Sequence, residues 1–156
     1  MTTSARAGRK LFMTLPVTDV ARSTEFFTKL GFEFDPNFSD GSDIACMIVN
    51  EQTSVMLGSH EKYAEFAKRP MADPTTYGIA LYCFGVDDRD EVDTVVDAAV
   101  AAGAEDHDDA EDHGFMYSRS FYDLDGHGWQ VMWMDPAAAE QGPEEFAAAA
   151  QQADAG

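Results

Sequence analysis

Three residues in the last third of the chain, His113, Tyr117 and Arg119, carry side chains that can bind or protonate an anion. Arginine offers a planar set of donors to a carboxylate or phosphate, and histidine and tyrosine can transfer protons. Side chains alternate along a strand, so Tyr117 and Arg119 are expected on one face, with His113 nearby. In a second, structural interpretation, Arg119 pairs with the acidic segment before it and Tyr117 packs with its hydroxyl at the rim. The residue types alone leave both interpretations open.

The acidic segment itself, residues 105–113, reads EDHDDAEDH. Carboxylates and imidazoles are ligands of divalent cations, but a run of like charges is more often a solvated loop. We expect a solvated loop beside a short strand. His60 and His127, near a helix start and in a turn, are expected at the surface. The possible cation ligands of the segment are His107, Asp108, Asp109, Glu111, Asp112 and His113.

Residues 115–135, FMYSRSFYDLDGHGWQVMWMD, have the pattern of a β-hairpin. Aromatic and apolar residues dominate on both sides, and the DLDG of residues 123–126 is typical of a tight turn. Strands this apolar need a covered face, so the hairpin is expected to close one end of a larger sheet. Alternation places Gln130 and Met132 on one face. It places Trp129 and Trp133 on the other, where they are expected to pack against a helix.

The first half of the chain predicts a strand, a helix and three further strands. Residues 10–17 alternate between a set expected under a helix and a set on the opposite face, of which Phe12 and Thr14 are expected to face a cleft. The first set is Leu11, Met13, Leu15 and Val17, and the second is Phe12, Thr14 and Pro16. Asp19 is a typical N-cap and Gly31 a typical helix end, which predicts a helix over 19–30. Strands are predicted at 32–34, 44–49 and 54–58, and a helix at 59–69 before Pro70.

The same order of strand, helix-capping residue and helix-ending glycine recurs in the second half, where residues 77–86 predict a strand and residues 88–103 a helix. The starts Val17-x-Asp19 and Val86-x-Asp88 are 69 residues apart, which indicates an internal repeat. The expected organisation is a polar leader 1–9, a first βαβββ module 10–60, a helix and connector 61–76, a second βαβββ module 77–135 and an Ala/Glu-rich tail 136–156. In the tail, Pro143 is placed to start a helix. Phe146 is its only large apolar group, so we expect the tail to be loosely held.

Composition limits the class of partner. The 156 residues are 45% hydrophobic, which suits one compact domain or two small modules, and no apolar run approaches the about 20 residues of a membrane helix. With 29 acidic against 10 basic residues, nucleic acid and anionic membranes are poor partners. The acidity is a solubility device or a mark of salt adaptation. Cys46 and Cys83 stand in apolar runs and are expected as buried thiols, and a cytoplasmic location is expected.

Two phrases, LPVTDVARSTEFFTKLGF and FYDLDGHGWQVMWMD, resemble the most recognisable stretches of the glyoxalase, bleomycin-resistance and extradiol-dioxygenase superfamily, the vicinal oxygen chelate fold. The chain is most similar to a bacterial subgroup labelled predicted lactoylglutathione lyase. The resemblance covers residues 10–135. It implies an α+β fold of paired βαβββ modules that form a curved mixed sheet with a central cleft.

The resemblance also implies where a metal would be held, because metal-using members place one ligand on each of four strands. These positions are Phe12, Met56, Gly78 and Gln130. None is a carboxylate, histidine or thiolate, and a single glutamine amide falls short of the ligand count of a catalytic centre. No metal and no other cofactor are therefore expected.

Two functions stay open on this basis. The first is metal-independent binding of a small organic ligand, in resistance or sequestration, by a largely apolar cleft. The second is a glyoxalase-like lyase or isomerase of the lactoylglutathione lyase type with a non-standard site. Small members of the superfamily commonly complete their clefts across a two-fold interface, so a homodimer is expected. The expected ligand-binding residues are Phe12, Thr14, Met56, Tyr82, His113, Tyr117, Arg119, Gln130 and Met132, and Ala80 is expected in the same cleft.

Overall fold

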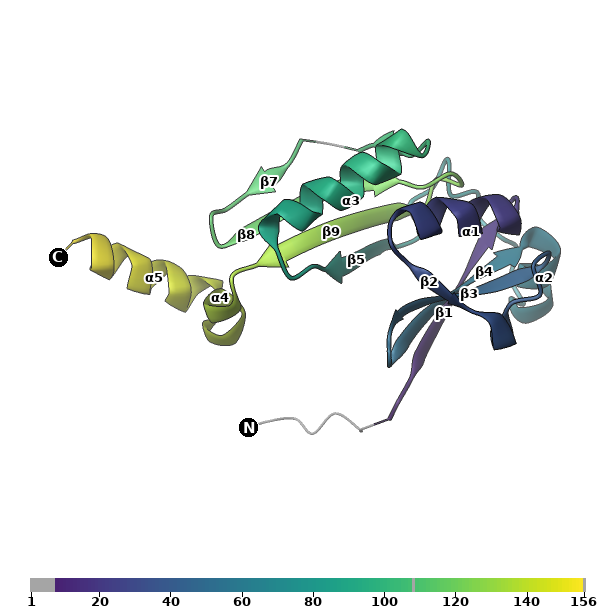
Figure 1. The fold of residues 1–156 in the computed structure, drawn as a ribbon, viewed down its shortest axis with the longest axis horizontal. Coiled ribbons are helices and arrows are strands. Elements are labelled where there is room, and N and C mark those ends of the chain that lie inside the picture. Colours follow the sequence, from purple (N-terminus) through teal and green to yellow (C-terminus); the bar gives the residue numbers. More distant parts are fainter. Residues whose placement is uncertain (1–7, 108, 156) are drawn as a thin grey trace. The chain divides into compact units, whose positions relative to one another are not determined.

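The structure is a computed structural model, and it describes residues 8–107 and 109–155. Most of the expected leader, Asp108 of the acidic segment and the last residue of the tail lie outside the described residues. The chain forms two compact units, residues 1–77 and 78–156, and each is described by itself (Figure 1). The finer division into modules, connector and tail stays a prediction.

The first unit contains one four-stranded mixed sheet, in the order β1-β4-β3-β2. Strand β1 runs parallel to β4, and the other two pairs are antiparallel. Its elements are β1 (Leu11–Val17), α1 (Val20–Lys29), β2 (Glu33–Asp35), the 3-10 helix η1 (Pro36–Phe38), β3 (Ile44–Asn50), β4 (Thr53–Ser59) and α2 (His60–Phe66).

Helix α1 and the sheet beneath it form the core of the first unit. The Asp19 carboxylate accepts a hydrogen bond from the backbone N–H of Arg22 (3.0 Å), which caps the helix as predicted. Phe26 and Phe27 are buried on α1, as are the apolar residues of β1 and β4 that share one face. These sheet residues are Leu15, Val17, Val55 and Leu57.

One residue of the face expected under the helix is an exception. Leu11 is 56% exposed, because a ten-residue helix is about 15 Å long and a seven-residue strand about 23 Å. The helix therefore leaves the N-terminal end of β1 uncovered. Only the C-terminal half of β1 is core.

The second unit repeats the plan. Its sheet has the order β5-β9-β8-β6, β7 also pairs with β8, and β5 runs parallel to β9 as β1 does to β4. Its elements are β5 (Leu81–Gly85), α3 (Arg89–Ala101), β6 (Glu105–Asp106), β7 (Glu111–Asp112), β8 (Met116–Tyr122), β9 (Gly128–Met134), α4 (Pro136–Gln141) and α5 (Pro143–Asp154). The predicted α+β class is confirmed: the described residues form two mixed sheets with helices, and neither sheet is a closed barrel.

Helix α3 lies along β8 and β9 and covers one face of the second sheet (Figure 1). It is capped by Asp88, whose side chain accepts a hydrogen bond from the Asp90 backbone N–H, and Gly103 follows it with φ 109°. Asp19 and Gly31, with φ 98°, hold the same places around α1. The fully buried residues beneath and on α3 are Val92, Val96, Ala99, Phe121 and Val131.

Two expected element boundaries are corrected. The strand predicted over 77–86 begins only at Leu81, because Leu81 pairs with Gly128, the first residue of β9, and earlier residues have no β9 partner. The helix predicted over 59–69 ends at Phe66, where Ala67 turns to extended backbone. In the tail, α5 begins at Pro143, as predicted, and α4 precedes it, while how loosely the tail is held stays a prediction. Ala138 of α4 is buried, and the rings of Phe115 and Phe146 lie 6.0 Å apart.

The two cysteines have different surroundings. Cys46 is buried, as predicted, but Cys83 is exposed on β5, so that half of the prediction is wrong. Both are free thiols. Among the residues that the structure describes, no helix is long and apolar enough to cross a bilayer.

Candidate functional site

The second sheet has one face under α3 and one face turned away from it. Neighbouring strands align Cys83 with Gln130 and Ser120, and align Met132 with Ser118. Directly paired residues share a face, so these side chains stand together on the side opposite α3. We call this the Gln130 face. Its residues are Leu81, Cys83, Gly85, Met116, Ser118, Ser120, Tyr122, Gly128, Gln130, Met132 and Met134.

The Gln130 face is neutral and partly open. On the described strands β5, β8 and β9, none of its side chains is charged. Gln130, Met132 and Ser120 are half-buried, and Cys83 is exposed. The part of the Cys83 side chain that the protein does cover raises the pKa of its thiol through lost hydration, which disfavours the nucleophilic thiolate. Hydroxyl, amide and thioether groups are therefore the chemistry that this face offers.

The opposite face carries the charges, and we call it the α3 face. The Tyr117 hydroxyl donates to Asp93 Oδ1 (2.8 Å), and Arg119 Nη1 donates to Asp93 (3.0 Å) and Asp97 (2.8 Å) on α3. Arg119 Nη2 also lies 3.6 Å from Asp106, and the arginine side chain is only 15% exposed. Tyr117 and Arg119 share a face, as predicted, but α3 covers it.

These contacts set the ionisation of the network. Burial opposes the charge of Arg119, but hydrogen bonds to Asp97 and Asp93 outweigh it and raise the arginine pKa. Burial and the hydrogen bond to Asp93 together raise the pKa of Tyr117. A phenol with a raised pKa and an arginine already paired with three carboxylates are poorly suited to protonate or bind an anion. The structural interpretation of the pair is the one that the geometry favours.

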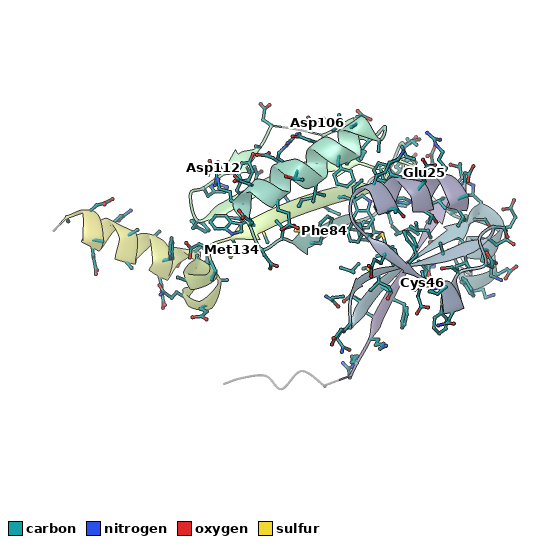
Figure 2. The ribbon with its side chains drawn as sticks, viewed as in Figure 1. Glu25, Cys46, Phe84, Asp106, Asp112 and Met134 are labelled. Carbon is teal, nitrogen blue, oxygen red and sulfur yellow. The ribbon has the colours of Figure 1, made fainter. Side chains whose placement is uncertain are left out.

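Asp112, which is labelled in Figure 2, pairs with Arg89 and extends the network along the same side. The Arg89 guanidinium donates both of its terminal nitrogens to Asp112 and stacks on the Tyr117 ring, 4.2 Å from the centroid. His113 is exposed, with Nε2 3.8 Å from Glu111. The three residues of the anion-binding hypothesis are therefore engaged with acidic partners, and their role toward a ligand stays a prediction.

The expected position of Tyr82 is corrected. It pairs with Trp129 in register, and their rings lie 5.2 Å apart, so Tyr82 stands on the α3 face and not beside Gln130. Trp129 is buried there, as predicted. Cys83 takes the place beside Gln130. Ala80 and Gly78 precede β5 altogether, and the 69-residue repeat that aligns Val17 with Val86 aligns Phe12 with Leu81.

In the first unit, the sheet face turned away from α1 holds three of the expected ligand-binding residues. Thr14 aligns with Met56, and Met56 with Cys46, while Phe12 lies two residues from Thr14 on the same side. Phe12 is 56% exposed. At the other end of this face, the Cβ position of Gly58 lies 3.8 Å from Thr14 Cγ2 and 3.8 Å from Lys62 Cβ of α2. Helix α2 therefore closes one end of the face and leaves the Phe12 end open.

The four positions at which the resemblance places a metal can now be tested on their donors. The resemblance gave Phe12, Met56, Gly78 and Gln130, and the 69-residue repeat moves the third position from Gly78, which precedes β5, to Leu81. Only Gln130 offers an oxygen, and a divalent ion needs several oxygen, imidazole or thiolate ligands. The described residues contain no group of three or more His, Cys, Asp or Glu side chains that could hold a metal ion, the described part of the acidic segment included. The donor set does not fit a divalent metal.

The turn that joins β8 to β9 is built on Asp123. Its carboxylate accepts hydrogen bonds from Trp129 Nε1 (2.9 Å) and from the backbone N–H groups of Asp125 (2.9 Å) and His127 (3.0 Å). Burial nonetheless raises the pKa of Asp123. His127, expected at the surface, is buried. The turn fixes the register that places Gln130 and Met132 on the open face.

Sequence reasoning missed three polar or thiol groups of the Gln130 face, Cys83, Ser118 and Ser120. The signal was present for the two serines, because Ser118 lies between Tyr117 and Arg119 and must point the other way. No sequence signal placed Cys83, since the parity of β5 depends on its pairing with β9.

Comparison with known proteins agrees with the fold. The family model of the Glyoxalase/Bleomycin resistance protein/Dioxygenase superfamily matches residues 11–131, and the chain belongs to this superfamily. A comparison with curated proteins gave no match.

Several solved structures share the fold at low identity. A hypothetical protein from S. aureus is 22% identical with a TM-score of 0.68, over 80% of this chain and 92% of the other. Lactoylglutathione lyase from Agrobacterium tumefaciens is 16% identical with a TM-score of 0.59, over 83% and 96%. A fosfomycin resistance protein from Listeria monocytogenes is 18% identical with a TM-score of 0.57, over 79% and 90%. At these identities the likeness concerns the fold alone.

Proposed function

We propose that the protein is a metal-independent small-molecule binding protein of this superfamily, acting in sequestration or resistance. The observation that carries the proposal is the chemistry of the four positions tested above, where three apolar side chains and one amide stand. The faces that hold them are half-open and mostly apolar, with a few polar groups for orientation, as ligand sites usually are. Each face is a candidate by itself, the face of the second sheet with Gln130 and Met132 and the face of the first with Phe12, Thr14 and Met56.

Metal content tests this proposal against the lyase or isomerase alternative. Protein purified without chelator is expected to hold no stoichiometric divalent metal by elemental analysis. Added zinc, nickel or manganese is expected to leave its melting temperature unchanged, because only binding to the folded state raises stability. About one metal per chain, lost in Gln130→Ala, would contradict the proposal and favour the enzyme.

Ligand binding is tested with a pair of adjacent residues. Phe12 and Leu11 are each 56% exposed but point to opposite faces of β1. A screen of small organic compounds is expected to yield binders whose affinity falls about tenfold in Phe12→Ala, since a buried aromatic contact contributes about 1.5 kcal/mol or more. Leu11→Ala is expected to bind as the natural chain does. Equal losses in both variants would show that the face has been misassigned.

We also propose a homodimer and a cytoplasmic location. Strands β1 and β5 end their sheets, and each carries a leucine that is more than half exposed, Leu11 and Leu81. Exposed apolar edges commonly mark association surfaces. Light scattering at micromolar concentration is expected to give twice the chain mass, and a monomer would contradict the proposal. Two free cysteines are in keeping with a reducing compartment.

A further inference from the structure

The hydroxyl of Ser118 differs from the other buried polar groups of the described chain. Ser118 is 1% exposed, and its Oγ has no hydrogen-bond partner. An unpaired buried hydroxyl costs free energy, so native structures usually pair such groups. Ser118 stands on β8 on the Gln130 face, between Glu111 of β7 and Met132 of β9 in register. The unused donor therefore belongs to the face that we propose binds a ligand.

The side chains around Ser118 define what can approach it. Three methionines share the face, with Met132 beside Ser118 and with Met116 and Met134 paired at the end of the two strands. Met134 is labelled at the end of β9 in Figure 2. Methionine side chains are flexible, can move to admit a ligand, and make favourable contacts with aromatic rings. The surroundings thus favour an aromatic body next to the hydroxyl.

The charges around the Gln130 face further narrow the class of ligand that it can bind. The inner strands of the face carry no charged side chain, and the charged residues that pair with them at the edge, Glu111 and Glu105, are acidic. The nearby cation Arg119 points to the other face and is paired with three carboxylates. An anion on the Gln130 face would lose its hydration beside Glu111 and Glu105, with no lysine or arginine among the side chains that β5, β8 and β9 place on this face, in a chain of net charge −19.

We propose that the Gln130 face binds an uncharged aromatic carbonyl compound, whose carbonyl oxygen accepts a hydrogen bond from Ser118 Oγ while its ring packs among the methionines. This inference rests on the proposed function and names the ligand class for the same face. Gln130, which can both donate and accept, is the second polar contact.

Three compounds of nearly equal shape test separately whether the ligand needs a carbonyl acceptor and whether it must be uncharged. Acetophenone carries the ring and the carbonyl, benzoate adds a negative charge, and ethylbenzene lacks the acceptor. We expect acetophenone to shift the amide resonances of Ser118 and Gln130 in NMR titrations of the full chain. We expect benzoate to bind at least tenfold more weakly than acetophenone, and ethylbenzene about fivefold more weakly, as the loss of one hydrogen bond implies.

Two serine variants separate binding from folding. Ser118→Ala removes an unpaired hydroxyl, so the free protein is expected to keep or gain stability while its affinity for acetophenone falls about fivefold and that for ethylbenzene does not change. Ser39→Ala is the control, because Ser39 Oγ donates to the Asp35 carbonyl and accepts from the Cys46 N–H. It is expected to lose stability and to retain acetophenone affinity.

Several results would overturn the inference. One is that benzoate binds as tightly as acetophenone, and another is that Ser118→Ala leaves the acetophenone affinity unchanged. The third is that acetophenone does not bind up to its solubility limit, which is the result expected if a second copy of the chain covers the Gln130 face. Suppose instead that the protein is metal-free and binds another screened compound with an affinity that falls in Phe12→Ala, but does not bind acetophenone. In that case only this inference fails, and the proposed function stands. Metal bound at Gln130 would instead overturn the proposed function.

Discussion

The two faces of the second sheet, although built from alternate residues of the same strands, have opposite chemistry. On β8, Tyr117 and Arg119 point to α3 and are bound to its carboxylates, while Ser118 between them points away and has no partner. The α3 face uses its charges to hold the helix on the sheet. The strands β5, β8 and β9 place no charged side chain on the Gln130 face, although Glu111 and Glu105 pair with it at the edge, and the face is left partly open. Tyr117 and Arg119, which look reactive in the sequence, are therefore engaged by α3, and their role toward a ligand stays a prediction, while the neutral residues between them belong to the candidate site.

The first sheet shows the same division between a covered and an open face. Truncating one side chain on each face tests this division, and it is expected to have the largest effect on stability. Leu15→Ala should lower the free energy of unfolding by about 2 to 5 kcal/mol, because Leu15 is buried under α1. Phe12→Ala should cost about 1 kcal/mol or less, because more than half of the side chain is already in water. Urea denaturation measures both. If Phe12→Ala unfolds the protein and Leu15→Ala leaves it untouched, the faces are inverted.

Breaking the α3 network should have the next largest effect. Arg119→Met keeps much of the side-chain volume but removes the charge-assisted hydrogen bonds to Asp93 and Asp97, for an expected loss of about 1 to 3 kcal/mol. Lys29→Ala is the control, because it breaks the exposed pair with Glu25 and should cost less than about 0.5 kcal/mol. The division of faces also requires that ligand affinity in Arg119→Met stays unchanged. A large loss of ligand affinity with unchanged stability would show that Arg119 contributes to ligand binding.

The pH dependence of stability also distinguishes the two faces, because Asp93 of the α3 network has a shifted pKa. Burial favours its neutral form, but hydrogen bonds from Tyr117 and Arg119 outweigh burial and lower its pKa. A carboxyl whose folded pKa lies below its unfolded value stabilises the fold above the unfolded pKa, near 4, and this contribution is lost as the pH falls through the folded pKa.

Unfolding free energies measured from about pH 6 down to about pH 2 should therefore fall more steeply in the natural chain than in Arg119→Met, where this contribution is largely absent. The Ser118→Ala variant, altered on the neutral face, should follow the natural chain. Parallel curves for the natural chain and Arg119→Met would show that the network does not lower the carboxyl pKa.

Salt gives the smallest expected effect. With a net charge of −19, the folded chain repels itself, and raising NaCl from about 0.05 M to about 1 M shortens the Debye length from more than 10 Å to about 3 Å. The melting temperature should rise by a few degrees. Acetophenone affinity should change little, since the Gln130 face is neutral. A marked loss of affinity with salt would show that charges contribute to the site.

Much of the fold followed from local patterns. Asp19 and Asp88 cap α1 and α3, and the 69-residue repeat predicted two units of the same plan, because capping and alternation depend on neighbours in sequence. The resemblance to the superfamily was confirmed by the family model over residues 11–131. The residue types at the four positions could be read from the sequence, since this needs only residue identities and an approximate alignment, and the absence of a metal stays a prediction.

The faces of the second sheet were decided by tertiary structure. Which side Tyr82 and Cys83 point to depends on where β5 begins to pair with β9, a contact across more than forty residues of sequence that periodicity does not contain. The burial of His127 likewise comes from the turn around Asp123 and not from its own neighbours. Alternation alone placed Arg119 with Tyr117. Only the packing of α3 showed that their charges are satisfied by Asp93 and Asp97, because pairing partners are set by which elements meet in space.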